Sequence, residues 1–467
     1  MKQGRSVIDV VRADGPISVQ VGPAEWFVRR GEHTSLSPAG GVVYWRRGAE
    51  TTLEFTETLE QFCFAPRLDE VDVAWLLAAA LGAQRPLGRT HLRGVGRVPA
   101  PGTGWFSADG VILRADIASL NALIRPVEAS SAVDRLRELI RDLPEWDGPH
   151  PAMLADGGPG SRFILAQRPQ IGRITVDDHT GEVTVDGQRA WSVETLMADL
   201  PPVWPMLWDR HLPAALAVVA AARAGVATVV TGHDLRRLLS AHPDELAALK
   251  PGRWTGELPL AFETRRPPYR RARHKARTAP SEQQHPGMWT WLTSEGAERV
   301  HAVDTAGQAT WLRWTGDAAP WIGELLTAWA DPGLAWLRET ARRVDVRLVI
   351  PAWLPEILAA LQAVPMSARA RVQHGLISNG PLLNPPDDPP HPATDGRRRT
   401  RAAAAAWASG DTGARSLDRL AKGTLVDTRM LDGEQIRRVT EDPFTRTQHA
   451  LALRRLCALD FWLEGLQ

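Results

Sequence analysis

The chain has 467 residues, of which 44% are hydrophobic and 23% are charged. That length predicts two or three folded domains, and the composition excludes a largely disordered chain. The net charge of +1 predicts no general attraction to nucleic acid or to a membrane surface. With only two cysteines, Cys63 and Cys457, the chain has neither a disulfide framework nor a cysteine-based zinc site, and we expect both to pack in apolar surroundings.

The N-terminus and the most apolar stretch of the chain indicate where in the cell the protein is expected. No apolar run follows the N-terminus as it does in a signal peptide, and the most apolar stretch, 213–232, is interrupted by Arg223. We therefore expect a cytoplasmic protein with no membrane partner. Arginine carries most of the positive charge, and together with the alanine, proline and glycine content this favours a bacterial source with a GC-rich genome.

The first 125 residues are predicted to be rich in β-structure. Short alternating runs such as 41–45 and 52–55 are separated by glycine and proline, which is typical of strands joined by turns. One helix is predicted within this region, over 71–83, with Asp69 or Asp72 as its N-cap.

The pattern changes after residue 126, where strands and helices alternate. An amphipathic helix is predicted over 133–143, followed by a strand and a glycine-rich turn over 152–160 and a short β-like segment over 172–185. A long apolar helix, 214–224, precedes a strand at 227–230. This alternation predicts a parallel sheet covered by helices on both faces.

The last part of the chain contains two predicted loops and a helical end. The loops are a basic, proline-bearing stretch over 265–284 and a second proline-rich stretch over 379–400. Residues 401–467 are predicted to be helical, ending in an amphipathic run over 447–466.

Five segments resemble the asparagine-synthetase family in their order and approximate spacing, and the chain is most similar to the lasso-peptide cyclases of that family. They are residues 84–102, the turn 154–162, the segment 229–239, the strand and helix at 346–365, and the C-terminal stretch 423–463. The resemblance implies an α+β, β-rich domain of the glutaminase (Ntn) type over 1–125. It also implies an α/β domain of the ATP-pyrophosphatase type over 126–467, with a parallel sheet and a helical C-terminus. The family's activity is the ATP-dependent, AMP-forming synthesis of amide bonds.

The residues at the implied nucleotide site depart from the family pattern. Three glycines and a serine still suit a phosphate-binding loop after a strand, but Asp156 stands where a phosphate is expected and Pro159 lacks an amide donor. Gly160 and Arg236 stand where the family has the two aspartates that hold Mg²⁺, and neither residue type ligates this ion. The predicted remnant of the nucleotide site is Asp156, Gly157, Gly158, Gly160, Ser161, Thr231, Gly232, Arg236 and Arg237. The alternative is that Arg236 and Arg237 bind phosphate directly in place of the metal.

Two further positions concern catalysis. Lys2 stands where the family's glutaminase nucleophile would be a cysteine, so ammonia from glutamine is not expected, as in lasso cyclases. Lys422 falls near the position of the family's catalytic lysine, which implies stabilisation of a transition state.

Three other groups of residues are candidates for binding. The basic run 265–277 includes Arg270, Arg271 and Arg273, which are candidates for binding a peptide, another anion or RNA, or for a solvated loop. Trp311 and Trp314 belong to a tryptophan-rich region that predicts either core packing or a peptide groove. His233 and Asp234 are either an acid–base pair or part of a loop surface.

These observations lead to one principal hypothesis and two alternatives. The principal hypothesis is a non-catalytic member of the family that binds a precursor peptide or a maturation enzyme during ribosomal peptide natural-product biosynthesis, with no cofactor or metal. The first alternative is an active amide- or isopeptide-forming ligase (a macrolactam cyclase) with a rewired site that uses ATP and Mg²⁺. The second is an RNA-associated protein that uses the basic run, although we do not expect nucleic acid to be the main partner.

Overall fold

The computed structural model describes three short N-terminal strands and most of residues 42–115, 128–205, 211–239, 290–315, 330–382 and 404–467. The predicted loops at 265–284 and 379–400 lie outside the described residues, apart from Asn379 and Leu382. The predicted domain boundary near residue 125 also falls outside them and stays a prediction.

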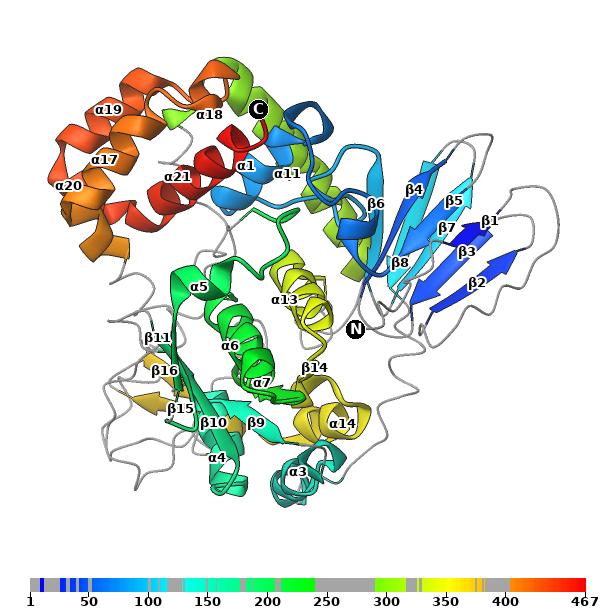
Figure 1. Ribbon diagram of the computed structural model, residues 1–467. Helices are drawn as coiled ribbons and strands as arrows, with labels where there is room; N and C mark the ends of the chain where they lie inside the picture. The colour runs from blue at the N-terminus through cyan, green and yellow to red at the C-terminus, as the bar shows by residue number, and fades with distance from the viewer. Residues whose placement is uncertain are drawn as a thin grey trace.

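The N-terminal part is built from two four-stranded antiparallel sheets, drawn in blue and cyan in Figure 1. The strand orders are β1-β5-β4-β6 and β2-β3-β7-β8. Trp45 and Phe55 of the first sheet pack edge-on against Phe106 of the second, with ring centroids 5.0 and 5.7 Å away. The prediction of a β-rich region is confirmed. The strands are β1 (Asp9–Val11), β2 (Trp26–Arg30), β3 (Thr34–Pro38), β4 (Val42–Arg47), β5 (Leu53–Thr56), β6 (Val95–Pro99), β7 (Gly102–Ser107) and β8 (Gly110–Ala115).

The second part is organised around a six-stranded sheet in the order β12-β11-β10-β9-β13-β14. Strands β10, β9, β13 and β14 are parallel, whereas β11 and β12 are antiparallel to their neighbours. The expected parallel sheet is therefore present in four strands, and the sheet as a whole is mixed, because the connections from β10 to β12 are too short for a crossover and return as hairpins. The strands are β9 (Pro151–Leu154), β10 (Gly172–Val176), β11 (Glu182–Val185), β12 (Arg189–Ser192), β13 (Thr228–Thr231) and β14 (Arg347–Val349).

Helices flank this sheet, as the alternation of elements predicted (Figure 1). The most apolar is α6, whose central residues are all buried and which packs on α13 and on several strands of the sheet. The helices are α3 (Ala132–Arg141), α4 (Pro159–Gln167), α5 (Val193–Met197), α6 (Leu212–Arg223), α7 (Leu235–Leu239), α13 (Pro332–Arg343), α14 (Pro355–Ala363) and α15 (Met366–Arg369). A separate hairpin follows, formed by β15 (Ala370–Gln373) and β16 (Leu376–Asn379).

The order of the parallel strands creates a switch point between β9 and β13. From β9 the chain passes through α4 to β10 on one side, and it later enters β13 and β14 on the other side. Thr231 pairs with Leu154 at the last position of the two strands, so the loops after β9 and β13 lie next to each other. Open α/β sheets bind their ligands at this position.

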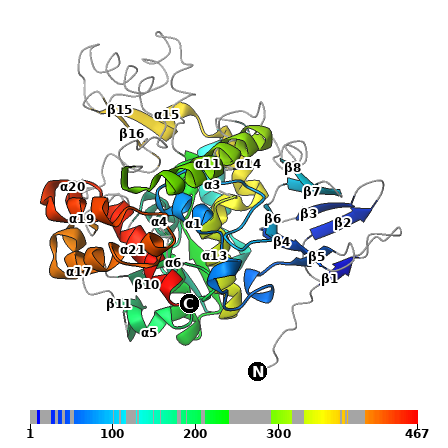
Figure 2. The same ribbon diagram turned by 90° about the horizontal axis from the view of Figure 1, so that it is seen from above.

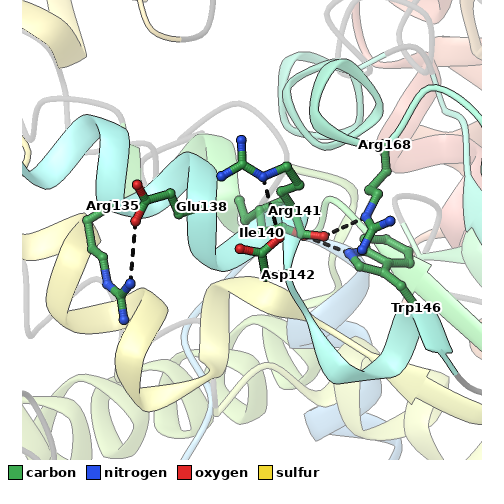
Figure 3. A network of polar contacts seen from close by, with 7 residues as sticks. All are labelled: Arg135, Glu138, Ile140, Arg141, Asp142, Trp146 and Arg168. Carbon is green, nitrogen blue, oxygen red and sulfur yellow. Dashed lines mark hydrogen bonds and ion pairs between the residues drawn. The ribbon is translucent and has the colours of Figure 1, made fainter.

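The C-terminal end of α4 is anchored away from this edge. Arg168, the C-cap residue of α4, donates a hydrogen bond to the carbonyl oxygen of Arg141 at the end of α3, as Figure 3 shows. The Trp146 indole donates to the carbonyl oxygen of Ile140 at 2.6 Å in the same group of contacts. These bonds satisfy carbonyls that a helix end leaves without internal partners.

The predicted helix over 71–83 forms as α1 (Val73–Ala80), and it joins the N-terminal part to the C-terminal helices. Asp72 is its N-cap and accepts from the Trp75 amide at 3.0 Å. Helix α1 packs on α11 (Ser294–Thr315) and α21 (Ala450–Glu464), and Figure 2 shows it beside both. Just after α1, the Gln84 amide donates to the Asp304 carboxylate of α11 at 2.7 Å.

The C-terminal residues are helical, as predicted, and are drawn in orange and red in Figure 1. The amphipathic run expected over 447–466 is divided at His449, which ends one helix and begins the next. The helices are α17 (Asp411–Leu420), α18 (Thr424–Asp427), α19 (Gly433–Glu441), α20 (Pro443–Gln448) and α21. Within the described part of the chain, no helix is both long and apolar enough to cross a membrane.

Candidate functional site

The loop between β9 and α4 is closed by its own aspartate. One carboxylate oxygen of Asp156, Oδ1, accepts from the Gly158 amide at 2.8 Å and also from the Ser161 hydroxyl. Gly158 is the N-cap residue of α4, Pro159 follows it, and the Ser161 side chain is buried. The carboxylate therefore occupies one amide donor and one hydroxyl donor at the start of α4, where a helix end would otherwise favour a phosphate.

The loops after β9 and β13 touch through their glycines. A Cβ atom added at Gly160 would lie 2.6 Å from the carbonyl oxygen of Gly232, and one added at Gly232 would lie 2.4 Å from the Ser161 amide nitrogen. No side chain fits at either position without moving backbone, because real Cβ atoms do not approach so closely. The carboxylate that the family resemblance implies at position 160 has no room here.

The turn between β13 and α7 carries a chain of hydrogen bonds that ends on an aspartate. The Thr231 hydroxyl lies 2.9 Å from Nδ1 of His233, and Nε2 of His233 lies 3.0 Å from Nδ1 of His211. Nε2 of His211 in turn lies 3.2 Å from Oδ2 of Asp331. The two imidazoles are nearly parallel, with an interplanar angle of 22° and centroids 5.0 Å apart.

The members of this chain come from three separate elements. His211 is the N-cap residue of α6, Asp331 is the N-cap residue of α13, and Thr231 ends β13. Oδ1 of Asp331 accepts from the Gly333 amide at 2.9 Å, and Oδ2 lies opposite Nε2 of His211. His211 and Thr231 are buried, and His233 is half-buried.

The sequence drew attention to His233 and Asp234 as neighbours, but it missed His211 and Asp331. Both ring nitrogens of His233 are engaged by Thr231 and His211, and the carboxylate at the end of the chain is Asp331. Asp234 has a positive φ of 59°, which is uncommon outside glycine. A signal for Asp331 was present, since an aspartate before Pro332 is typical of a helix start.

A buried carboxyl group joins the two parts of the molecule. Glu339 on α13 accepts from the Leu59 amide at 2.9 Å and from the Trp204 indole at 2.7 Å. Burial raises the pKa of Glu339 to about 7, although these two hydrogen bonds act in the opposite direction. Burial also raises the pKa of Tyr44 on β4, and the nearby charge of Glu339 adds to this effect.

A buried histidine, His91, packs against Trp204, the residue whose indole donates to Glu339. Nε2 of His91 lies 2.7 Å from the carbonyl oxygen of Val203, and the ring centroids of Trp204 and Trp462 are 4.9 and 6.1 Å away. Burial lowers the pKa of His91 to about 4, so the ring is neutral at physiological pH. Arg97 on β6 is also buried; burial lowers the pKa of its guanidinium, whereas Tyr44 and Asp331 raise it.

The remaining predicted residues have contacts of their own or lie outside the described residues. Lys422 forms an exposed ion pair with Asp418 one turn earlier, at 3.0 Å, and its proposed role stays a prediction. On α11, Trp314 is buried in the core and Trp311 is half-buried against it. The positions outside the described residues are Gly157, the side chains of Arg236 and Arg237, and Arg270, Arg271 and Arg273.

The two cysteines and the metal-ligating residue types provide no further candidate site among the described residues. Cys63 and Cys457 are free and partly buried against the core, and burial raises the pKa of Cys457 to about 12. In the part of the chain that the structure describes, no three His, Cys, Asp or Glu side chains are grouped so that they could hold a metal ion. No protein-family model matches the sequence, and no curated protein matches it either.

Proposed function

We propose that this chain is a member of the asparagine-synthetase family, nearest to the lasso-peptide cyclases, that has lost Mg²⁺–ATP chemistry. In this proposal it serves as a non-catalytic accessory that binds a precursor peptide or a maturation enzyme. The observation that carries the loss of chemistry is the Asp156 carboxylate, which holds the Gly158 amide and the Ser161 hydroxyl.

The arrangement of the fold supports the family assignment. An N-terminal unit of two antiparallel sheets is followed by a sheet whose parallel strands meet at a switch point, in the chain order that the resemblance implies. The two loops that would form the nucleotide site, after β9 and β13, lie next to each other at that point.

Charge and space both oppose a nucleotide at these loops. A triphosphate approaching α4 would meet the negative charge of Asp156 in place of free amide and hydroxyl donors. A metal-binding carboxylate at position 160 would collide with the Gly232 carbonyl. These features support a site that has lost both its phosphate cradle and one metal ligand.

The test is a pair of measurements on the purified chain. Calorimetry with ATP and Mg²⁺ should show no binding, and a pyrophosphate-release assay with candidate precursor peptides should show no turnover. Mg²⁺-dependent release of pyrophosphate by the unmodified protein would refute the proposal and favour an active ligase.

A substitution sharpens this test. Asp156→Ser removes the carboxylate and frees the Gly158 amide and the Ser161 hydroxyl, so we expect weak phosphate or ATP binding to appear in this variant alone. Asp186→Ser is the matched control, because the Asp186 carboxylate also accepts a backbone amide, from Arg173 at 2.7 Å, but beside the start of β9 and not in the loop that follows it.

A further inference from the structure

The carboxyl group of Glu339 is the buried centre of the contact between α13 and the N-terminal part. Its Oε1 accepts from the amide of Leu59, the first residue of the 3-10 helix η1 (Leu59–Gln61), at 2.9 Å. Its Oε2 accepts from the indole of Trp204 at 2.7 Å, and Glu339 is only 4% exposed. One carboxyl group thus holds three segments together: α13, η1 and the stretch between α5 and α6.

Two ion pairs lie at the rim of this contact. Arg342, almost one turn after Glu339 on α13, pairs with Glu57 at 2.8 Å, and Arg343 pairs with Glu60 at 2.6 Å. Both arginines are therefore engaged by carboxylates of the N-terminal part. Among the residues that the structure describes, no lysine or arginine forms an ion pair with Glu339 itself.

The two protonation states of Glu339 suit this position differently. The carboxylate accepts from both N–H groups, but it places a negative charge in the interior with no cation paired to it, which is costly. The neutral acid removes that charge and has a proton to donate. The buried hydroxyl of Tyr44 on β4 interacts with this carboxyl group and has no hydrogen bond of ordinary geometry, so it is available to accept that proton.

The groups around the carboxyl group make Glu339 the one that titrates here. Burial raises the pKa of Glu339 to about 7 against the effect of its hydrogen bonds, and the like charge of Glu60 adds to the rise. Burial raises the pKa of Tyr44 well above its ordinary value, although Arg97 on β6 and Arg342 act in the opposite direction. Tyr44 therefore stays neutral over the range in which Glu339 changes its charge.

We propose that Glu339 is a proton-operated lock between the N-terminal part and α13. The neutral carboxyl group holds η1 and Trp204 against the helix, and ionisation loosens this contact while the sheets on both sides stay folded. The stretch that carries Trp204 leads into α6, whose N-cap residue His211 contacts the β13 turn, so the lock lies between the N-terminal part and the candidate site. It operates whether or not the chain binds ATP or a peptide.

The indole N–H of Trp204 reports the charge of Glu339 directly, because it donates to that carboxyl group. The 19 tryptophans are labelled with ¹⁵N, and the Trp204 signal is assigned with Trp204→Phe. Between about pH 5 and about pH 8.5, the signal should shift with one midpoint near pH 7. His91, which packs against Trp204, has a pKa of about 4 and stays neutral throughout this range.

Glu339→Gln and a second indole provide the controls. The glutamine keeps an acceptor oxygen but cannot ionise, so the shift of the Trp204 signal should be absent in this variant. The Trp462 indole, which donates to the Pro202 carbonyl oxygen at 3.1 Å, should shift far less in the unsubstituted chain. No titration of the Trp204 signal, or the same titration in Glu339→Gln, would overturn the lock.

A rim substitution keeps the test decisive if Glu339→Gln does not fold. Glu60→Gln removes the like charge and frees Arg343, and both changes favour the ionised form of Glu339. The midpoint of the Trp204 signal should therefore move to lower pH. An unchanged midpoint in this variant would contradict the titration of Glu339.

Amide hydrogen exchange measures the loosening itself. After correction for the intrinsic rate, protection of η1 should fall by more than about tenfold between about pH 5 and about pH 7.5, because opening lets Glu339 release its proton at its ordinary pKa of 4.5. The fall should be absent in Glu339→Gln. Protection of η1 should also be lower than that of β13 at every pH, and equal protection would show that this contact opens only when the whole chain unfolds, which would overturn the lock.

Discussion

The loops after β9 and β13 lie side by side at one edge of the same sheet, but they are built in different ways. The β9 loop is fixed by contacts within six residues, since Asp156 binds the Gly158 amide and the Ser161 hydroxyl. The β13 turn is fixed by partners that are distant in sequence, because His211 precedes it by about 20 residues and Asp331 follows it by about 100. The β9 loop is thus held by its own side chains in addition to its contact with Gly232, whereas the β13 turn depends on the relative positions of α6, α13 and β13.

The largest expected effect concerns the place where the two loops touch. Gly232→Ala puts a Cβ atom 2.4 Å from the Ser161 amide nitrogen, so one loop must move away from the other. We expect a loss of about 3 kcal/mol in the free energy of unfolding, measured by urea denaturation.

The control for this substitution is Gly465→Ala at the end of α21. Its added Cβ atom would have only ordinary contacts, the nearest at 3.4 Å, and its φ of −68° suits any residue. We expect a change within about 0.5 kcal/mol. Equal effects of the two substitutions would show that the two loops are not packed as described.

Two buried groups with distant partners should give opposite pH dependences of stability. The pKa of His91 is about 4 in the folded chain and 6.5 ordinarily, so the unfolded chain binds more protons between these values and stability falls as the pH drops through this range. The pKa of Glu339 is about 7 in the folded chain and 4.5 ordinarily, so the folded chain binds more protons and stability falls as the pH rises from about 4.5 to about 7. Each contribution is about 3 kcal/mol in size.

Single substitutions separate these contributions, which partly cancel in the unsubstituted chain. The stability of His91→Gln relative to the unsubstituted chain should fall as the pH rises from about 4 to about 6.5, and that of Glu339→Gln should rise between about 4.5 and about 7. Urea denaturation at several pH values measures both slopes. Slopes of the same sign in the two test variants would contradict the assignment.

Local patterns in the sequence predicted much of the fold. The helix at α1 and its Asp72 cap, the strand at β9, the apolar helix α6 and the strand at β13 all follow from periodicity and capping within a few residues. The β-like segment predicted over 172–185 contains β10 and β11, but the antiparallel direction of β11 and the strand β12 were not anticipated, because the direction of a strand depends on the length of its connections as well as on its own residues.

The sequence predicted only the part of the candidate site whose residues are close together along the chain. Asp156, Gly160 and Ser161 belong to one loop, and their sequence order placed them together. The partnership of His233 with His211 and Asp331 depends on which helix N-termini the sheet brings together, and no spacing along the chain encodes that. The hydrogen bonds of Asp156 to the Gly158 amide and the Ser161 hydroxyl could not be predicted either. The residue type indicates a negative charge, but it does not indicate which donors the carboxylate contacts.

A pair of double-mutant cycles tests whether the β9 loop and the β13 turn belong to separate hydrogen-bond networks. His211→Gln replaces one partner of a hydrogen bond and Asp331→Asn removes the charge of the other partner, so their effects on the free energy of unfolding should be coupled by about 1 kcal/mol. Asp156→Ala and Asp331→Asn belong to different networks, so their effects should add within about 0.5 kcal/mol. Coupling in the second cycle as large as in the first would mean that the two loops form one network.

The smallest expected effect tests a local contact at the surface. Lys422 and Asp418 are about two-thirds exposed and pair across one turn at the end of α17, at 3.0 Å. Exposed pairs of this kind contribute little, because water screens the charges and both side chains lose freedom. Lys422→Ala and Asp418→Ala should each change the free energy of unfolding by less than about 0.5 kcal/mol, measured by urea denaturation. A loss above about 1 kcal/mol for Lys422→Ala alone would show that the lysine has a further partner, and Lys422 would then join His211 and Asp331 among the residues whose role depends on distant contacts.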